Sequence, residues 1–483
     1  MRTKREPNRL LGAVMAQVGV SNKGLAARVR SLAQREGYSI SPDHVSVRRW
    51  LAGCIPRART AEYVARALGA KLGRRVTPAD LGWIPDPADV RHELEVPGDP
   101  VVASQRAWRE VRQHLIRHGS ELFSQAAQLY EPSWRLPQAP ELSQDSWLPE
   151  QPIALEEVKL DWEPNPPEPM VTGQEPEVSS LLPLRTRRQT FPSYSSAIRY
   201  LDPPELFENR PCYRLLGASL GGPGEVRFQF GQSCFFDKID VAEPLVHEFC
   251  VAAMNATPYW PELPFRSLIA DPFDLALRAV NTSINTLTIR REPDSGRASF
   301  FLLRRNPARV VTGGGLYCLI PAGEFQPASM SPGSLLSDLS IWRNIVREYS
   351  EELLRQPEHD GSTGRPLAYQ RWPFFRAMQK ARERGELRVY VLGVTLNALS
   401  LNAAVVTVAV IDSVIFDALF HELTHSNAEG EVMVHLGNDK QELGLTFDET
   451  TVNHLLHRER LASPNVQAAL SLAWQHRATL LEA

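Results

Sequence analysis

The 23 residues from Val389 to Ile411 contain no charged side chain, and this run constrains the fold more than any other part of the chain. A run of this length can cross a bilayer as a helix. However, Asn397, Ser400 and Asn402 interrupt it near its middle, and β-branched residues are frequent in the flanking segments. We therefore interpret it as two buried strands joined by a turn, and not as a membrane span.

Two such strands need other layers to cover them, and 483 residues are too many for one ordinary core. Apolar patterning predicts strands over residues 225–231, 286–292, 297–305, 316–322, 388–396 and 403–411. It predicts helices over residues 243–254, 339–355, 373–385, 449–459 and 465–482. Because strands and helices do not alternate strictly, we expect an α+β body over residues 201–483 in a multidomain chain.

Charge is distributed unevenly between the N-terminal segment and the rest of the chain. Residues 1–84 contain 16 Lys or Arg and 5 Asp or Glu, a net charge of +11. The remaining residues contain 37 Lys or Arg and 51 Asp or Glu, a net charge of −14. This asymmetry favours a polyanionic partner for the N-terminal segment.

The N-terminal segment has the apolar spacing of successive helices, over residues 8–19, 24–37, 41–53, 59–70 and 77–83. In the third of these, Ser41 is the predicted N-cap, Pro42 lies in the first turn and Gly53 ends the helix. We therefore predict an all-helical domain, the head, over residues 1–85.

The order of these helices resembles the helix-turn-helix family of phage-repressor (Cro/C1) type. The matching segments are "GLAARV" at 24–29, "VSVRRWLAGCIP" at 45–56 and "EYVARALG" at 62–69. The resemblance implies that 45–56 is a recognition helix for the major groove of double-stranded DNA, and that a homodimer reads paired half-sites. The join between the first two segments is longer than is usual in that family.

Residue chemistry near the start of the recognition helix is compatible with base reading. His44, Ser46, Arg48 and Arg49 lie there, and arginine can bind guanine through two hydrogen bonds. For phosphate neutralisation the candidates are Arg28 and the other basic residues Arg2, Lys4, Arg5 and Arg30. The alternative is a helical protein-interaction module with a solvated basic face.

Residues 86–200 have a different composition from the segments on either side. A long helix is predicted over 102–130, and Pro- and Glu-rich stretches without periodicity surround it. We interpret this region as a linker that can wrap onto a neighbouring domain.

The segment "REYSEE" at 347–352 contains three glutamates within five positions. Glu348, Glu351 and Glu352 have the spacing i, i+3 and i+4, which places them on one face of an α-helix. Such carboxylates repel one another unless a cation lies among them, and Mg²⁺ prefers oxygen ligands. We predict a Mg²⁺ site there, with Arg347 bracing one glutamate. The alternative is an ordinary charged helix surface.

The same segment resembles the Nudix box, G-x5-E-x7-R-E-U-x-E-E-x-G-U, where U is apolar. Arg347, Glu348, Tyr349, Glu351 and Glu352 match its R-E-U-x-E-E core. The likeness extends over about residues 265–483, and it implies that the three glutamates carry the metal and, in an active enzyme, catalysis.

Two departures from the Nudix box concern the substrate loop. Leu354 replaces the glycine after E-E-x, and Leu339 replaces the upstream glutamate. The loop can begin at Gly333, with the usual spacing, or at Gly323 of "PAGE", with ten extra residues. These departures favour a ligand-binding sensor over an efficient hydrolase.

The segment "HELTH" at 421–425 is a competing metal motif. His421 and His425, one helical turn apart, can hold Zn²⁺, with Glu422 as general base. The apolar residues before it suit the helix of a zinc peptidase. However, Gly430 follows closely and no third ligand is recognisable, which weakens this alternative.

The five cysteines are scattered without a C-x-x-C pair, and the N-terminus lacks the apolar stretch of a signal peptide. We therefore expect a cytoplasmic transcriptional regulator that binds double-stranded DNA and a nucleotide-type ligand, without a membrane partner. The alternatives are a Mg²⁺-dependent nucleoside-diphosphate-X pyrophosphohydrolase and a zinc metallopeptidase fused to the helix-turn-helix head.

Overall fold

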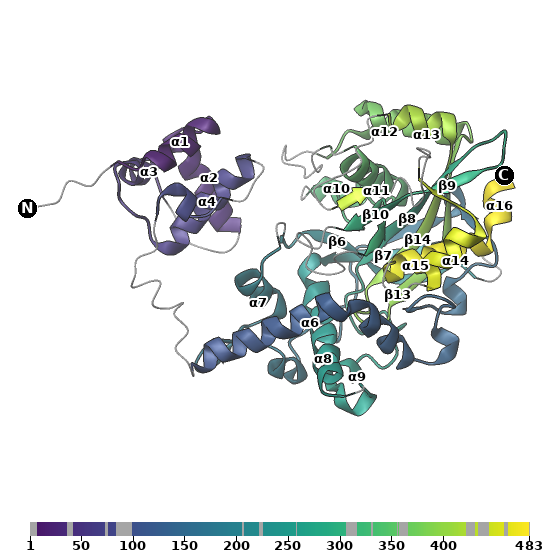
Figure 1. Cartoon of the computed structure of the whole chain (residues 1–483), viewed down its shortest axis with the longest axis horizontal. Helices are drawn as coiled ribbons and strands as arrows, with labels where there is room; N and C mark the ends of the chain where they lie inside the picture. The colour runs from purple at the N-terminus through teal and green to yellow at the C-terminus, as the bar shows by residue number, and fades with distance from the viewer. Residues whose placement is uncertain are drawn as a thin grey trace, which may run out of the picture. The chain divides into compact units, whose positions relative to one another are not determined.

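The computed structural model divides the chain into two compact units, Met1–Asp99 and Pro100–Ala483, and each is described by itself (Figure 1). It describes residues 7–35, 42–72, 76–83, 99–204, 207–221, 226–256, 258–305, 316–329, 332–354, 356, 366–421, 430–432, 444–457 and 462–482. The first unit is helical and the second combines helices with strands, as predicted.

The head is a bundle of short helices around one apolar core. Its elements are α1 (Arg9–Gln17), α2 (Asn22–Arg35), α3 (His44–Leu51), α4 (Ala58–Leu72) and the 3-10 turn η1 (Ala79–Leu81). The helix α2 packs against both α3 and α4. Leu25, Val47 and Val64 are fully buried between them, and Trp50 meets Trp83 edge to face with ring centroids 6.1 Å apart. These contacts position α3 with one face outward.

The start of α3 differs from the predicted N-cap. Asp43 is the N-cap, its side chain accepts a hydrogen bond from the backbone N–H of Ser46, and the helix begins at His44. Ser41 lies outside the described residues. The helix ends before Gly53, which has a φ of 89°, as the sequence predicted.

The second unit is built on one mixed sheet with the order β1-β13-β14-β8-β9-β16, to which β12 adds on β8 and β2 adds on β13. These strands are β1 (Glu141–Leu142), β2 (Ile153–Ala154), β8 (Thr282–Arg291), β9 (Ala298–Phe300), β12 (Ala322–Glu324), β13 (Leu387–Asn397), β14 (Ala403–Asp412) and β16 (Leu445–Thr446). Most pairs are antiparallel, whereas β14 runs parallel to β8.

The uncharged run forms β13 and β14, two antiparallel strands joined by a short turn, as predicted. Side chains of β14 alternate between two cores. Val405 and Ala409 belong to the larger core, and Val406 and Val408 to the smaller one. Burial on both faces explains why the run carries no charge. Among the described residues, no helix is long and apolar enough to cross a membrane.

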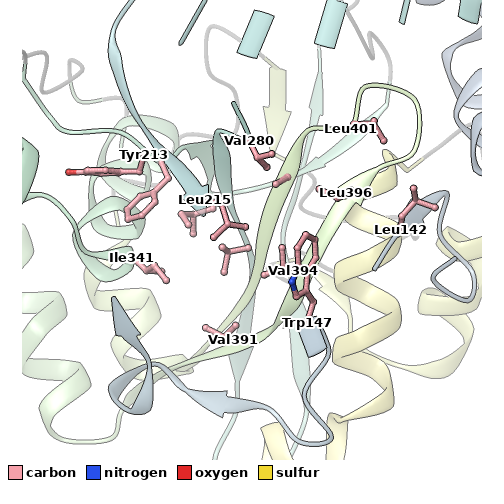
Figure 2. Packing of buried hydrophobic residues seen from close by; sticks show 14 of the residues in the cluster. Leu142, Trp147, Tyr213, Leu215, Val280, Ile341, Val391, Val394, Leu396 and Leu401 are labelled. Carbon is pink, nitrogen blue, oxygen red and sulfur yellow. The ribbon is translucent and has the colours of Figure 1, made fainter. Parts of the chain in front are cut away.

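Helices cover the sheet on its two faces (Figure 1). The larger core contains side chains of α11 (Ile341–Glu348), α12 (Pro373–Glu383) and α13 (Ser413–Leu419). The smaller core contains side chains of α14 (Glu449–His457), α15 (Pro464–Gln475) and α16 (Arg477–Glu482). Figure 2 shows part of the larger core, which includes Trp147 and the β13 residues Val391, Val394 and Leu396. The end of α11 is thereby held beside β8 and β12.

The region predicted as a linker is, from Pro100 onward, part of the second unit. The predicted long helix is α6 (Pro100–Gln128), and β1 and β2 pair with β13. Leu142, Trp147 and Ile153 belong to the larger core. The apolar groups in this region are too short and irregularly spaced to produce a periodic signal, although together they cover a sheet edge.

The remaining strands and α-helices of the second unit include α8 (Phe235–Asn255), whose side chains enter the larger core. The others are β3 (Lys159–Glu163), β6 (Pro211–Ser219) and β7 (Arg227–Cys234) in one sheet, β10 (Leu302–Arg305), β11 (Tyr317–Leu319) and β15 (Gly430–Val432) in another, β4 (Leu184–Thr186) with β5 (Gln189–Thr190), and the helices α7 (Tyr194–Leu201), α9 (Pro264–Ser267) and α10 (Pro332–Ser337).

Candidate functional site

The outward face of α3 carries three of the four residues predicted to read bases. His44, Arg48 and Arg49 are exposed, and Arg28 on α2 is exposed as well. Val47 and Trp50 hold the opposite face of α3 in the core. The helical period thus separates the buried side chains from the basic ones.

Ser46, the fourth predicted reader, is engaged within the helix terminus. Its hydroxyl donates to Asp43 Oδ1 at 2.8 Å, and its backbone N–H donates to the same oxygen at 2.8 Å. The backbone N–H of Ser46, and then its hydroxyl, hold the pKa of Asp43 below its ordinary value. This capping box ties Ser46 to helix stability, so its hydroxyl is less available for a base edge.

An open hollow of about 870 Å³ lies beside α3 in the head. Its lining residues come from the segment before α3, from α3, from the turn after it and from the start of α4: Pro42, Ser46, Arg49, Trp50, Cys54, Ile55, Pro56, Arg57, Arg59 and Thr60. Arg49, Arg57 and Arg59 are all exposed. The hollow therefore presents three guanidinium groups around one concave surface, which suits an anion with several oxygens.

Arg57 and Arg59 were not among the predicted contact residues. The sequence signal was present, because "PRART" supplies two arginines and a threonine immediately at the start of α4. A helix N-terminus also directs backbone N–H groups at an anion. Only the packing of α4 against the preceding elements shows that these residues share a hollow with Arg49.

The glutamate segment of the second unit changes helix type at its middle. The α-helix α11 ends at Glu348, and a π-helical turn (Tyr349–Leu353) follows. A π-helix bonds i to i+5, so the spacing predicted for one α-helical face does not hold for Glu351 and Glu352. All three glutamates are half-buried, whereas the alternative of an ordinary surface helix calls for exposed ones.

Two of the glutamates meet the short strand β12. Glu352 Oε2 accepts a hydrogen bond from the backbone N–H of Ala322 at 3.2 Å. The Glu348 carboxyl lies against Gly323, where an added Cβ would come within 2.1 Å of Glu348 Cδ. Gly323, one of the two glycines considered as the start of the loop, is therefore in contact with a glutamate.

Arg347 connects α11 to the loop that follows β12 by a hydrogen bond. Its buried guanidinium donates to the Tyr369 hydroxyl at 2.6 Å, to the Gln326 carbonyl at 2.6 Å and to Asn344 Oδ1 at 2.9 Å. We expected this arginine to brace a glutamate, but one of these hydrogen bonds joins α11 to the loop at Gln326 and another joins α11 to Tyr369. Tyr349 is fully buried and its hydroxyl is 2.8 Å from Thr288 Oγ1, which holds the π-helical turn on β8.

Metal ligands are not assembled as a set in the part of the chain that the structure describes. There, no three His, Cys, Asp or Glu side chains lie together in a group that could hold a metal ion. The neighbouring carboxylate of Glu324 forms an ion pair with Lys238 of α8. Mg²⁺ binding by Glu348, Glu351 and Glu352 therefore stays a prediction.

The competing zinc motif falls largely outside the described residues, which exclude Glu422 and His425. The helix α13 ends at Leu419, before the first histidine. His421 is exposed, with Nδ1 3.1 Å from the Ala418 carbonyl oxygen. The α-helix predicted to carry both histidines thus ends before the motif begins.

Residues 11–84 match the family model of the SP15 N-terminal domain, so the matched segment lies within the head. No curated protein matches the chain.

Proposed function

We propose that this protein is a DNA-binding transcriptional regulator whose head binds double-stranded DNA. The observation that supports this most strongly is the hollow beside α3, with the exposed residues Arg49, Arg57 and Arg59 around it. The net charge of +11 over residues 1–84 adds a long-range attraction to a polyanion.

The positions of the side chains suggest that α3 and the start of α4 contact different parts of the DNA. His44, Arg48 and Arg49 lie on the exposed face of α3, where a recognition helix presents side chains to the major groove. Arg57 and Arg59 lie at the start of α4 and suit contacts to phosphate oxygens. In this proposal α3 supplies sequence preference, and the start of α4 supplies affinity without sequence preference.

The test uses the full chain and fluorescent duplex DNA at several salt concentrations. We expect binding at low salt, and selection from a random duplex pool then yields a preferred site. Arg49→Ala is expected to weaken binding to that site by about 1–3 kcal/mol. Lys71→Gln is the matched control, because Lys71 is exposed and lies about 18 Å along α4 from Arg59. Absence of DNA binding at low salt would overturn the proposal.

We further propose that the second unit binds a nucleotide-type ligand at the glutamate segment in a Nudix-like manner. The supporting observation is that Glu348 and Glu352 both approach β12 around Gly323, next to the loop fastened by Arg347. Half-buried carboxylates suit a hard cation, and Mg²⁺ at Glu348, Glu351 and Glu352 would neutralise phosphate oxygens of the ligand.

Thermal unfolding of the full chain with nucleoside diphosphates and ADP-ribose, with and without MgCl₂, tests this part. We expect a Mg²⁺-dependent rise in Tm that Glu352→Gln removes. Glu383→Gln, at an exposed position of α12, is the control. No nucleotide effect in any combination would contradict ligand binding at this site.

The same samples separate the sensor from the two enzyme alternatives. Mg²⁺-dependent release of nucleoside monophosphate, abolished by Glu352→Gln, would make the second unit a hydrolase. Stoichiometric zinc that is lost in His421→Ala would instead favour the peptidase. We propose the sensor because the departures at Leu339 and Leu354 affect the substrate loop. Paired half-sites in the selected DNA would indicate that a homodimer binds.

A further inference from the structure

The long helix α6 carries two histidines that face each other across one turn. The rings of His114 and His118 are stacked, with centroids 4.4 Å apart and planes inclined by 27°. The spacing i, i+4 places both side chains on the same face of the helix. His114 is half-buried and His118 is exposed. Two imidazoles are thus held side by side at the surface of the second unit.

The backbone beneath this pair is held by the fold. The opposite face of α6 is buried, and the helix packs against α8 and β4. Residues on both sides of the pair take part in this packing, including Trp108, Val111, Leu115 and Leu122. Because the helix does not have to form on binding, a ligand that bridges the two rings loses little affinity to backbone ordering.

Charge around the pair is compatible with a cation. Glu110 lies one turn before His114, and Glu121 lies one turn after His118, so one stripe of the helix reads Glu, His, His, Glu. Glu121 accepts a hydrogen bond from Gln125 at 3.3 Å. An imidazole in its neutral form has a lone pair for a metal ion.

We propose that His114 and His118 chelate one late first-row transition-metal ion, such as Ni²⁺, Cu²⁺ or Zn²⁺. Imidazole nitrogen is a preferred ligand for these ions, and two imidazoles one helical turn apart can share one ion. Among the described residues, no group of three His, Cys, Asp or Glu side chains is placed so that it could hold a metal ion. The site therefore has two histidine ligands, and water completes the coordination. It is separate from both the glutamate segment and the "HELTH" motif in the sequence.

Isothermal titration of the untagged full chain with NiCl₂ tests the proposal. We expect one Ni²⁺ per chain. Binding of Ni²⁺ is expected to be at least about tenfold weaker in His118→Ala, because loss of a direct ligand costs no less affinity than loss of a residue that supports a ligand. Binding is expected to be unchanged in His421→Ala. Unchanged binding in His118→Ala, or loss in His421→Ala, would overturn the assignment, as would absence of binding to the original chain.

A second variant tests whether Ni²⁺ binding depends on the spacing of the two histidines or only on their number. Gln113→His combined with His118→Ala keeps two histidines on the same helix but makes them neighbours in sequence, which do not face each other. Gln113 is exposed, so this exchange leaves the core unchanged. We expect weak Ni²⁺ binding in the double variant and circular dichroism like that of the original chain. Recovery of tight binding would show that spacing is irrelevant and would contradict the proposal.

Discussion

The exposed arginines around the hollow of the head and Arg347 of the glutamate segment occupy opposite environments. Arg49, Arg57 and Arg59 are exposed around an open hollow, whereas Arg347 is 4% exposed and makes three hydrogen bonds within the fold. Exposed charges of one sign act over a distance and tolerate movement of the ligand. A buried charge instead fixes its neighbours, because leaving it without partners costs several kcal/mol. The first arrangement suits a polyanion and the second suits a local binding site.

The largest expected effect concerns the buried arginine. Arg347→Ala is expected to lower the free energy of unfolding of the second unit by about 4 kcal/mol, because three polar partners lose a charged donor. Urea denaturation measures it. Arg376→Ala, at an exposed position of α12, is expected to cost about 0.5 kcal/mol or less. Similar small losses in both variants would show that Arg347 does not hold the loop.

A buried carboxyl in the region predicted as a linker gives a pH dependence to the second unit. Burial raises the pKa of Glu141 to about 7, against an ordinary value of 4.5, while the Asn397 side chain opposes the shift. Between these values the unfolded chain ionises first, so stability is expected to fall as pH rises, by up to about 1.4 kcal/mol per pH unit. Below pH 4.5 Glu141 is protonated in both the folded and the unfolded state, so its contribution to the free energy of unfolding is fully present.

The control for this effect is Glu141→Gln, which cannot ionise. Urea denaturation from pH 4 to 8 is expected to show a flatter profile for this variant than for the original chain. Parallel profiles would mean that Glu141 does not titrate in this range.

The exposed arginines of the head are expected to affect binding and its salt dependence, and not stability. Exchanging both Arg57 and Arg59 for Gln is expected to weaken DNA binding for all sequences alike, and to reduce the slope of log K against log salt by about 2. Fluorescence anisotropy over a salt series measures this slope. If Lys71→Gln reduces it equally, the hollow has no special part in phosphate contact.

The smallest expected effect separates helix capping from base reading. Ser46→Ala removes the hydroxyl that donates to Asp43 but keeps the backbone hydrogen bond to the same oxygen. We expect a loss of about 0.5 kcal/mol in the stability of the head and an unchanged preferred DNA site. A changed base preference in the selected DNA would return Ser46 to the reading role first predicted for it.

The predicted helices and strands are confirmed where the hydrophobic or charge pattern lies within one short segment. The helices of the head and the pair β13 and β14 follow from periodicity and from the absence of charge. For residues 86–200 the sequence predicted a long helix and a linker that can wrap onto a neighbouring domain, but not the pairing of β1 and β2 with β13. The short apolar groups of this region have partners that lie far away in the chain. In the candidate glutamate site, the sequence named Arg347 and the three glutamates as candidates, but it did not predict the π-helical turn or the hydrogen bonds of Arg347.

The sequence by itself determined which residues are buried in regular elements and where charge collects, because periodicity and net charge are properties of neighbouring residues. Only the tertiary structure brought Arg57 and Arg59 into one hollow with Arg49, and Gly323 against Glu348. Those contacts join residues from separate elements, and their geometry depends on packing that no local pattern encodes. The physical reason is that a side chain's environment is set by all the elements that pack around it.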